Sequence, residues 1–216
     1  PSYPIHTYGF IIAGATIRSV PTTPDEAYWE ALDQAMAYTS PRPSVLVVNY
    51  PSNPTAETVD LAFYERLVAW ARENKVWVLS DLAYSELYYD GKPTRSILEV
   101  PGAKECAVEF TSMSKTYSMA GWRMGFAVGN PQLIAALTRV KSYLDYGAFT
   151  PIQAAACAAL SLGAVAPYGR YADAKALGIS DWGPKVPAQL AWCLQELPSL
   201  VVPLVCLVRR GWGPTK

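Results

Sequence analysis

The sequence contains one histidine, His6, which excludes any metal or catalytic site that needs two or more. It also lacks a surplus of either charge, since 18 Lys and Arg residues balance 18 Asp and Glu residues. Proteins that bind nucleic acid gain most of their affinity from basic contacts to phosphate, so no nucleic-acid partner is expected. The longest apolar run, Leu200–Val208, is nine residues long and contains Pro203, whereas a membrane helix needs about 20 residues. We therefore expect no membrane partner.

Cysteines are few and widely spaced: there are four, and no two form a Cys-x-x-Cys pair. A zinc ribbon or a disulfide framework is not expected, no metal site is predicted, and we predict a soluble, cytoplasmic protein. Charged residues make up 17% of the sequence and hydrophobic residues 51%, which favours elements buried on more than one face. The sequence starts at Pro1 without an initiator Met or a signal-peptide pattern, so we interpret it as a piece of a longer protein.

Short β-branched runs alternate with helical patterns along the first three quarters of the chain. The run Val45–Asn49 (VLVVN) is typical of a strand covered on both faces. Thr55 is the expected N-cap of the helix that follows, with Glu57 in its first turn. Tyr8–Ala15 is apolar and interrupted by glycine, and we expect a buried strand or turn there. The other predicted strands are Val76–Ser80, Ala107–Ser112 and Met124–Val128, and the predicted helices are Asp25–Tyr38, 55–74, Pro131–Tyr143 and Ile152–Leu162.

The alternation of strands and helices predicts an α/β fold with a mostly parallel sheet and crossover helices. In such sheets, ligands bind beyond the carboxyl ends of the strands. Asn53, Asp81 and Ser112 each close or follow a predicted strand. We expect these three polar side chains to converge on one crevice.

Lys115 follows a predicted strand in the segment TSMSKT, among small hydroxyl residues. It is either an ordinary surface lysine or a Schiff-base lysine, whose amine burial makes nucleophilic. Arg123 lies eight residues later and either pairs with a surface carboxylate or grips a phosphate bidentately. In the second case the hydroxyls of Ser112 and Ser114 would donate to the same phosphate.

Asp81 ends the run VWVLSD, where a buried carboxylate is costly unless it has a cationic partner or several donors. It either caps the following turn or pairs with a cationic ligand such as a protonated pyridine nitrogen. Tyr84, three residues later, can turn its hydroxyl to the same ligand. Asn53 is either a turn residue or an amide donor to a phenolate oxygen.

Taken together, these segments resemble a known family. NYPSNPT at 49–55, SDLAY at 80–84 and SMSKTYSMAGWRMGF at 112–126 are similar to class I and II aminotransferases of the pyridoxal-phosphate fold-type I group. PSYPIH at 1–6 fits the same family. The sequences of WRMGF and PSYPIH look most like its alanine and LL-diaminopimelate aminotransferase branch. The resemblance runs from Pro1 to about Leu160 and implies a three-layer large domain that binds pyridoxal 5'-phosphate.

The resemblance also implies a role for each matching residue. Lys115 would hold the cofactor covalently, and Asp81 would pair with its pyridine nitrogen. Tyr84 and Asn53 would hydrogen-bond the ring hydroxyl, and Tyr3 would stack on the ring. Ser112, Ser114 and Arg123 would bind the phosphate. His6 falls where the family places a histidine behind the pyridine-binding aspartate. An equally good interpretation is a core histidine that makes its hydrogen bonds within the protein.

The implied activity is transamination between a small L-amino acid, alanine-like or diaminopimelate-like, and a 2-oxo acid such as 2-oxoglutarate, with Lys115, Asp81 and Tyr84 catalytic. The complete protein is expected to be a homodimer. A fold-type I lyase, or a non-catalytic sensor domain of a transcription regulator, would share the same motifs. A fourth alternative is an incomplete chain that folds poorly and does nothing.

Two regions are expected. Residues 1–162 form the central part of the cofactor-binding large domain. Residues 163–216 do not align with the family, so the small domain is absent or unrecognisable, and this tail is either frame-shifted or the start of a divergent small domain. The present chain is expected to bind cofactor weakly and to transaminate negligibly.

Overall fold

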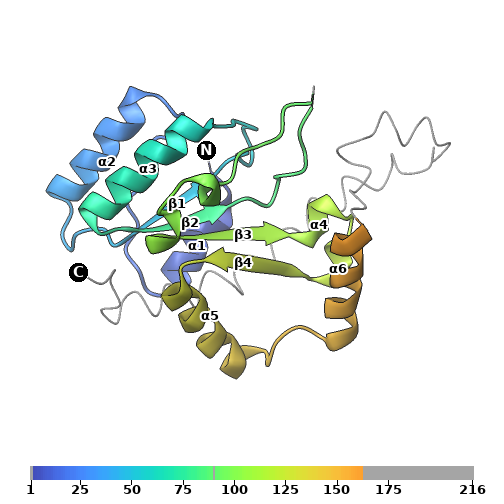
Figure 1. Cartoon of the computed structure of the whole chain (residues 1–216). Coiled ribbons are helices and arrows are strands. Elements are labelled where there is room, and N and C mark those ends of the chain that lie inside the picture. The colour runs from blue at the N-terminus through green and yellow to red at the C-terminus, as the bar shows by residue number, and fades with distance from the viewer. Residues whose placement is uncertain (1, 90, 163–216) are drawn as a thin grey trace.

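The computed structural model describes residues 2–89 and 91–162, and the predicted tail 163–216 lies outside the described residues. A four-stranded sheet in the order β1-β2-β3-β4 forms the centre (Figure 1). Strands β1 (Val45–Asn49), β2 (Trp77–Asp81) and β3 (Ala107–Ser112) are parallel, and β4 (Gly125–Gly129) runs antiparallel to β3. The predicted α/β class with a mostly parallel sheet is confirmed.

Helices cover both faces of this sheet. On one face, α2 and α3 lie side by side and pack on Val48, Val78 and Ala107 (Figure 1). On the other face, α1 and α5 pack on Trp77 and Leu79. The helices are α1 (Pro4–Ile12), α2 (Glu26–Tyr38), α3 (Leu61–Asn74), α4 (Met113–Thr116), α5 (Pro131–Leu144) and α6 (Thr150–Leu162), with short 3-10 turns η1 (Ile97–Glu99), η2 (Ala103–Glu105) and η3 (Ala120–Trp122).

Strand β2 shows why the predicted strands are apolar without alternation. Successive side chains point to opposite faces, so Val78 contributes to the α2–α3 side and Leu79 to the α1–α5 side. All five residues of β2 are buried. A strand covered on both faces needs apolar residues at every position, and the three layers follow from this.

Aspartates cap the two helices of the α2–α3 layer. Asp25 accepts a hydrogen bond from the backbone N–H of Tyr28, and α2 begins as predicted. For α3, the expected cap at Thr55 is wrong: the helix begins at Leu61, and Asp60 accepts from the N–H of Phe63 at 2.9 Å. The side chain of Thr55 instead donates to Glu57 at the surface, because the segment before Asp60 is not helical.

The prediction of a strand or turn over Tyr8–Ala15 is also wrong, because α1 occupies most of it. The helix starts at Pro4, whose missing N–H costs nothing at the first helical position, and Tyr3 before it is extended. It ends at Ile12, and two residues later Gly14 has a φ of 74°, in the left-handed region that glycine tolerates. Proline at the start and glycine just past the end were the available signals.

Glycines let β4 approach β3 closely. Gly129 has a φ of 150°, and a Cβ there would lie 2.4 Å from the carbonyl oxygen of Ala107. A side chain at that position would therefore push the two strands apart. Because β4 is antiparallel, its start lies beside Ser112 at the carboxyl end of β3. The segment that precedes β4 is thus brought to the edge of the sheet where ligands bind.

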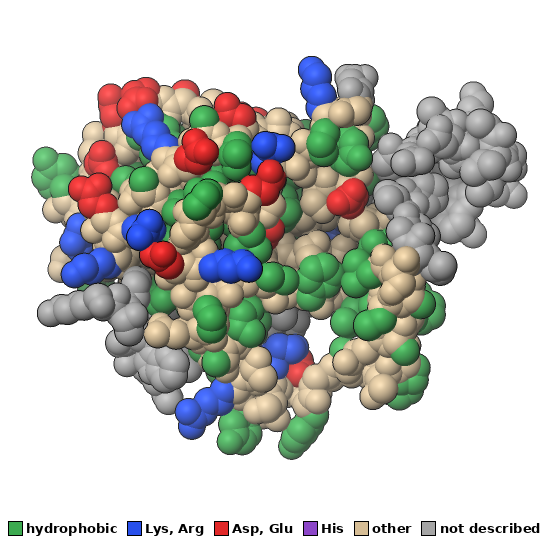
Figure 2. Space-filling model, viewed as in Figure 1, with side chains coloured by type: hydrophobic (Ala, Val, Ile, Leu, Met, Phe, Trp, Pro, Cys, Tyr) green, Lys and Arg blue, Asp and Glu red, His purple; other side chains and the backbone are tan. Residues whose placement is uncertain are grey.

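Charged side chains gather over the α2–α3 layer in the face shown by Figure 2, with acids and bases mixed. There Arg66 pairs with Glu26 at 2.8 Å and lies over the ring of Trp29, which ties α3 to α2.

In contrast, α6 carries no charged residue. None of the helices among the described residues combines the length and apolar character that a bilayer crossing demands.

Candidate active site

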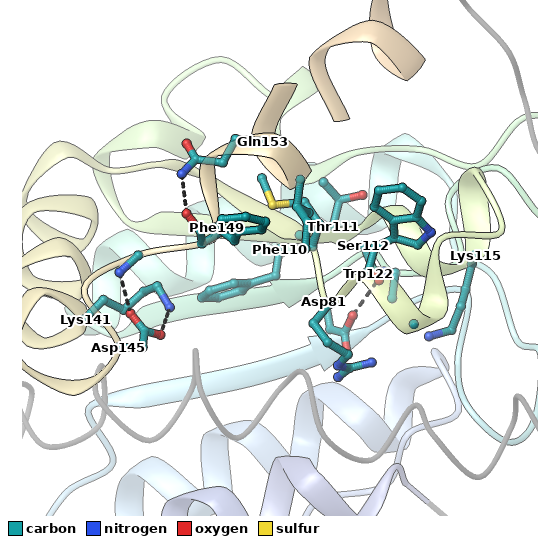
Figure 3. A pocket seen from close by; sticks show the side chains of 18 of the residues that line it. Asp81, Phe110, Thr111, Ser112, Lys115, Trp122, Lys141, Asp145, Phe149 and Gln153 are labelled. Atoms are coloured by element: carbon teal, nitrogen blue, oxygen red, sulfur yellow. Dashed lines mark hydrogen bonds and ion pairs between the residues drawn. The ribbon is translucent and has the colours of Figure 1, made fainter. Parts of the chain in front are cut away.

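The carboxyl ends of β2 and β3 open onto a cavity of about 610 Å³. Asp81 ends β2, Ser112 ends β3, and Arg123 lies two residues before β4. Figure 3 shows Asp81, Lys115 and Trp122 around this hollow. The cavity is lined on this side by Tyr3, Asn49, Asp81, Ala83, Tyr84, Phe110, Thr111, Ser112, Lys115, Gly121, Trp122, Arg123, Met124 and Gly125. Of the three side chains predicted to converge on one crevice, Asp81 and Ser112 line this cavity, whereas Asn53 does not.

Asp81 is buried at the wall of the cavity, with 4% of the residue exposed, and several hydrogen bonds hold it there. Its Oδ1 accepts the backbone N–H of Ala83 at 3.1 Å, and its Oδ2 lies 2.8 Å from Nε2 of His6 on α1. The side chain of Asn49 donates to the backbone carbonyl of Asp81 at 2.9 Å. These contacts fix the carboxylate at the cavity wall and offset part of the cost of burying it.

Lys115 lies on the one-turn helix α4, directly after β3. The side chain of Ser112 caps this turn by accepting the N–H of Ser114 at 3.2 Å. The Nζ atom of Lys115 lies 5.6 Å from the ring centroid of Tyr84, within the range of a cation–π contact. The amine therefore sits in the cavity beside an aromatic face from the segment that follows β2.

Arg123 ends η3 in the left-handed region, with φ 52° and ψ 47°. A non-glycine residue pays about 1 to 3 kcal/mol for such a conformation, and strain of this kind clusters at functional sites. Its Nη1 donates to the carbonyl of Ala120 at 3.0 Å, which fixes the guanidinium at the cavity wall.

The remaining predicted residues occupy three different positions. Tyr3 is 7% exposed, lines the cavity, and packs edge-on against the ring of His6 at 5.5 Å. Asn53 lines a second cavity of about 570 Å³ and reaches the first through its Nδ2, which donates to the hydroxyl of Tyr84 at 3.1 Å. Ser114 is 4% exposed and lies behind the lining of the first cavity.

Asn49 is a residue of the site that sequence reasoning missed. Its Oδ1 accepts the N–H of Asn53 at 2.9 Å, while its Nδ2 donates to the carbonyls of Asp81 and Pro51. One amide thus joins the ends of β1 and β2. The available signal was a polar residue at the last position of an apolar strand.

Two aromatic residues and a helical segment were missed as well. Phe110 and Trp122 line the cavity, and so do residues from the last turn of α5 to the first turn of α6 (Figure 3). Lys141 and Asp145 form an ion pair on that stretch, and Phe149 is exposed at 70%. Nothing in their local sequence pattern marks these residues, because the sheet topology brings them to the cavity.

Among the described residues there is no group of three or more His, Cys, Asp or Glu side chains arranged to hold a metal ion.

Residues 1–165 match the family model for aminotransferases of class I and II. The chain belongs to this family. Class I and II aminotransferases use pyridoxal phosphate as their cofactor.

Three curated aminotransferases are similar to the first three quarters of the chain. A putative aminotransferase, AatC, from Rhizobium meliloti is 61% identical over 161 residues, 74% of this chain and 40% of that protein. The glutamate-pyruvate aminotransferase AlaC of Escherichia coli is 52% identical, over 74% of this chain and 39% of that protein. An LL-diaminopimelate aminotransferase from Aquifex aeolicus is 44% identical, over 75% and 42%. The chain thus spans about two fifths of these relatives.

A solved structure is similar to the same three quarters of the chain. Substrate-bound BacF from Bacillus subtilis superimposes with a TM-score of 0.65 at 36% identity, over 74% of this chain and 41% of that one. The predicted α/β class of the aminotransferase large domain is therefore shown by structure as well as by sequence.

The donor set of the cavity fits pyridoxal phosphate. The phosphate needs cationic and hydroxyl donors, and Arg123 and Ser112 line one end of the cavity. The ring needs an anionic partner for its nitrogen and aromatic walls, which Asp81 and Tyr3 provide. The aldehyde needs an amine, and Lys115 lines the same cavity. No group in this set demands a different ligand.

Proposed function

We propose that the protein is a pyridoxal-phosphate-dependent aminotransferase that exchanges an amino group between a small L-amino acid, alanine-like or diaminopimelate-like, and a 2-oxo acid such as 2-oxoglutarate. The observation that carries the proposal is the meeting of Asp81, Lys115 and Arg123 at one cavity. The activities for which AlaC and the Aquifex protein are named support this substrate range. The proposal concerns the complete protein, of which residues 1–162 form the central part of the large domain.

The cofactor-binding roles follow from the chemistry of each side chain. Lys115 binds the cofactor through its amine. Arg123 and Ser112 hold the phosphate, and Ser114 supports Ser112 through its backbone N–H. Tyr3 stacks on the ring, while Tyr84 and Asn53, already bonded to each other, hold the ring hydroxyl.

Bound pyridoxal phosphate supplies an electron sink for the charge left when the α-proton of an amino acid departs. Asp81 keeps a proton on the ring nitrogen, because its buried carboxylate stabilises a cation there. The Nζ atom of Lys115 accepts the proton from the substrate Cα and returns it later. The hydroxyl of Tyr84 and the aromatic walls orient the reacting bond and exclude water.

The competing functions share the same cavity. A fold-type I lyase would use Lys115 and Asp81 in the same way, and a sensor domain would bind the cofactor without turnover. The relatives described above bear aminotransferase names, which favours transamination.

We further propose that the complete protein is cytoplasmic and a homodimer. Sedimentation at micromolar concentration tests the dimer, and a fully active monomer would contradict it.

The experiment is to measure amino-group transfer by the complete protein, loaded with pyridoxal phosphate, from alanine or LL-diaminopimelate to 2-oxoglutarate. Transfer that yields glutamate supports the proposal, whereas ammonia release indicates a lyase and the absence of both indicates a sensor. Asp81→Asn should lower kcat by several orders of magnitude, because a pre-organised charge is lost. The matched control Asp33→Asn lies on the exposed surface of α2, bonded to Trp70, and should leave kcat unchanged.

A further inference from the structure

Glu109 is a buried carboxylate behind the active site, with 8% of the residue exposed. It lies on β3 between Val108 and Phe110, which face α1 and α5, so its side chain points to the α2–α3 side. Its Oε1 accepts the hydroxyl of Ser96 at 2.7 Å. Its Oε2 accepts the N–H of Ile97 at 3.1 Å and the hydroxyl of Ser80 at 3.3 Å.

The groups around this carboxylate keep it in a polar cluster within the apolar layer. Burial raises the pKa of Glu109, and the nearby charge of Glu99 adds to the shift, while the three donors oppose it. From α3, Tyr64 faces the same cluster, and burial together with the Glu109 charge raises its pKa, so Tyr64 stays neutral. A buried acid is costly, and one bonded to three separate donors is a strong constraint on where those donors lie.

The three segments that meet at Glu109 each carry a residue of the candidate site. Ser80 directly precedes Asp81 on β2. Ser96 and Ile97 end the connection that begins after Asp81 and contains Tyr84. Glu109 itself is on β3, which leads to Ser112 and Lys115.

At its start, the connection between β2 and η1 is held to β3 by the N–H of Leu82, which donates to the carbonyl of Phe110 at 2.8 Å. Residues 82–89 and 91–96 contain no helix or strand, and one internal tie is the hydroxyl of Thr94, which donates to the carbonyl of Ser85 at 2.8 Å. The far end of this connection is bonded to the Glu109 carboxylate through Ser96 and Ile97, and the same carboxylate accepts a hydrogen bond from Ser80 on β2. Within it, Tyr84 presents its ring to Lys115 and its hydroxyl to Asn53.

We propose that Glu109 is a positioning residue of the active site, which holds Tyr84 against Lys115 and Asn53 by fixing the far end of the 82–96 connection to β3. It contacts neither substrate nor cofactor and acts through Tyr84. The link to cofactor binding rests on the proposed function, but the positioning of the connection does not. The test therefore has one measurement without cofactor and one with it.

The first measurement is amide hydrogen exchange of the protein without cofactor. Glu109→Gln replaces one acceptor oxygen by a donor amide, so the bonds from Ser80 and Ile97 are weakened. We expect exchange within 82–89 to rise about tenfold, while the amides of α5 stay unchanged. The control is Glu105→Gln, four residues before Glu109, which removes an exposed carboxylate paired with Arg72 and should change neither region. Unchanged exchange in 82–89, or an equal rise in α5, overturns the proposal.

The second measurement is a double-mutant cycle on the dissociation constant of pyridoxal phosphate. Glu109→Gln should weaken binding about fivefold in the wild-type background and less than about twofold in the Tyr84→Phe background, because coupled residues are not additive. Equal effects in both backgrounds overturn a role through Tyr84. If Glu109→Gln does not fold, Ser96→Ala, which removes the hydroxyl that donates to Oε1 of Glu109, takes its place in both measurements. If the wild type binds no cofactor, the proposed function fails while the exchange result still decides the positioning role.

Discussion

The Nε2 atom of His6 lies 2.8 Å from Oδ2 of Asp81, although 75 residues separate the two in sequence. Both side chains are almost completely buried. An ionised carboxylate accepts hydrogen bonds and donates none, so His6 carries a proton on Nε2. Helix α1 thereby supports, from behind, the carboxylate that we assign to the cofactor ring.

Removal of this contact should weaken cofactor binding. His6→Leu places an apolar side chain of similar size at this position and removes the hydrogen-bond donor to Oδ2 of Asp81. A hydrogen bond to a charged group is worth about 1.5 to 3 kcal/mol, so we expect the dissociation constant of pyridoxal phosphate to rise about tenfold or more. Cofactor titration followed by absorbance measures it. His6→Gln, which retains a donor, should recover part of the affinity, and equal affinity in all three proteins would refute the support role.

The start of α3 predicts a contrast between two capping candidates. Asp60→Ala removes the acceptor for the N–H of Phe63 and should lower the free energy of unfolding by about 1 kcal/mol. Thr55→Ala removes a surface contact to Glu57 and should change it by less than about 0.5 kcal/mol. Urea unfolding followed by circular dichroism measures both. A larger loss for the Thr55 variant than for the Asp60 variant would mean that α3 begins earlier than the structure has it.

Glu109 predicts a pH dependence of stability. Because its pKa in the folded protein is raised by burial above the ordinary value of 4.5, the folded state binds its proton more tightly than the unfolded state does. The stabilisation from this group is therefore fully present below pH 4.5 and is lost as pH rises through the folded pKa. The stability of the wild type relative to Glu109→Gln should fall over this range, as unfolding at a series of pH values will measure. A difference that grows with pH would mean that the hydrogen bonds outweigh burial and lower the pKa.

The sequence predicted the sheet well because burial on two faces leaves a local mark. The runs at Val45–Asn49 and Ala107–Ser112 match β1 and β3 at both ends. The prediction failed at α1, where apolar residues and Gly9 suggested a strand, and at the start of α3, where Thr55 was expected as the cap. In both places local signals mark the bounds, since Pro4 and Gly14 flank α1 and Asp60 caps α3.

The candidate site divides along the same line. Lys115, Asp81 and Arg123 stood out because charged residues at the ends of apolar strands are unusual. Glu109 and Asn49 did not, since their importance lies in bonds to segments distant in sequence, such as Ser96 and Asp81. The antiparallel direction of β4, which brings Arg123 to the same edge, likewise depends on strand pairing that the sequence pattern does not encode.

The central claim is that Lys115 is the residue that binds the cofactor, and Lys141 is the informative alternative because it lines the same cavity. The protein is incubated with pyridoxal phosphate, reduced with borohydride, digested, and the modified peptide is identified by mass spectrometry. We predict a pyridoxyl label on Lys115, which Lys115→Ala abolishes and Lys141→Ala leaves in place. A label on Lys141, or one spread over exposed lysines such as Lys104, would contradict the account.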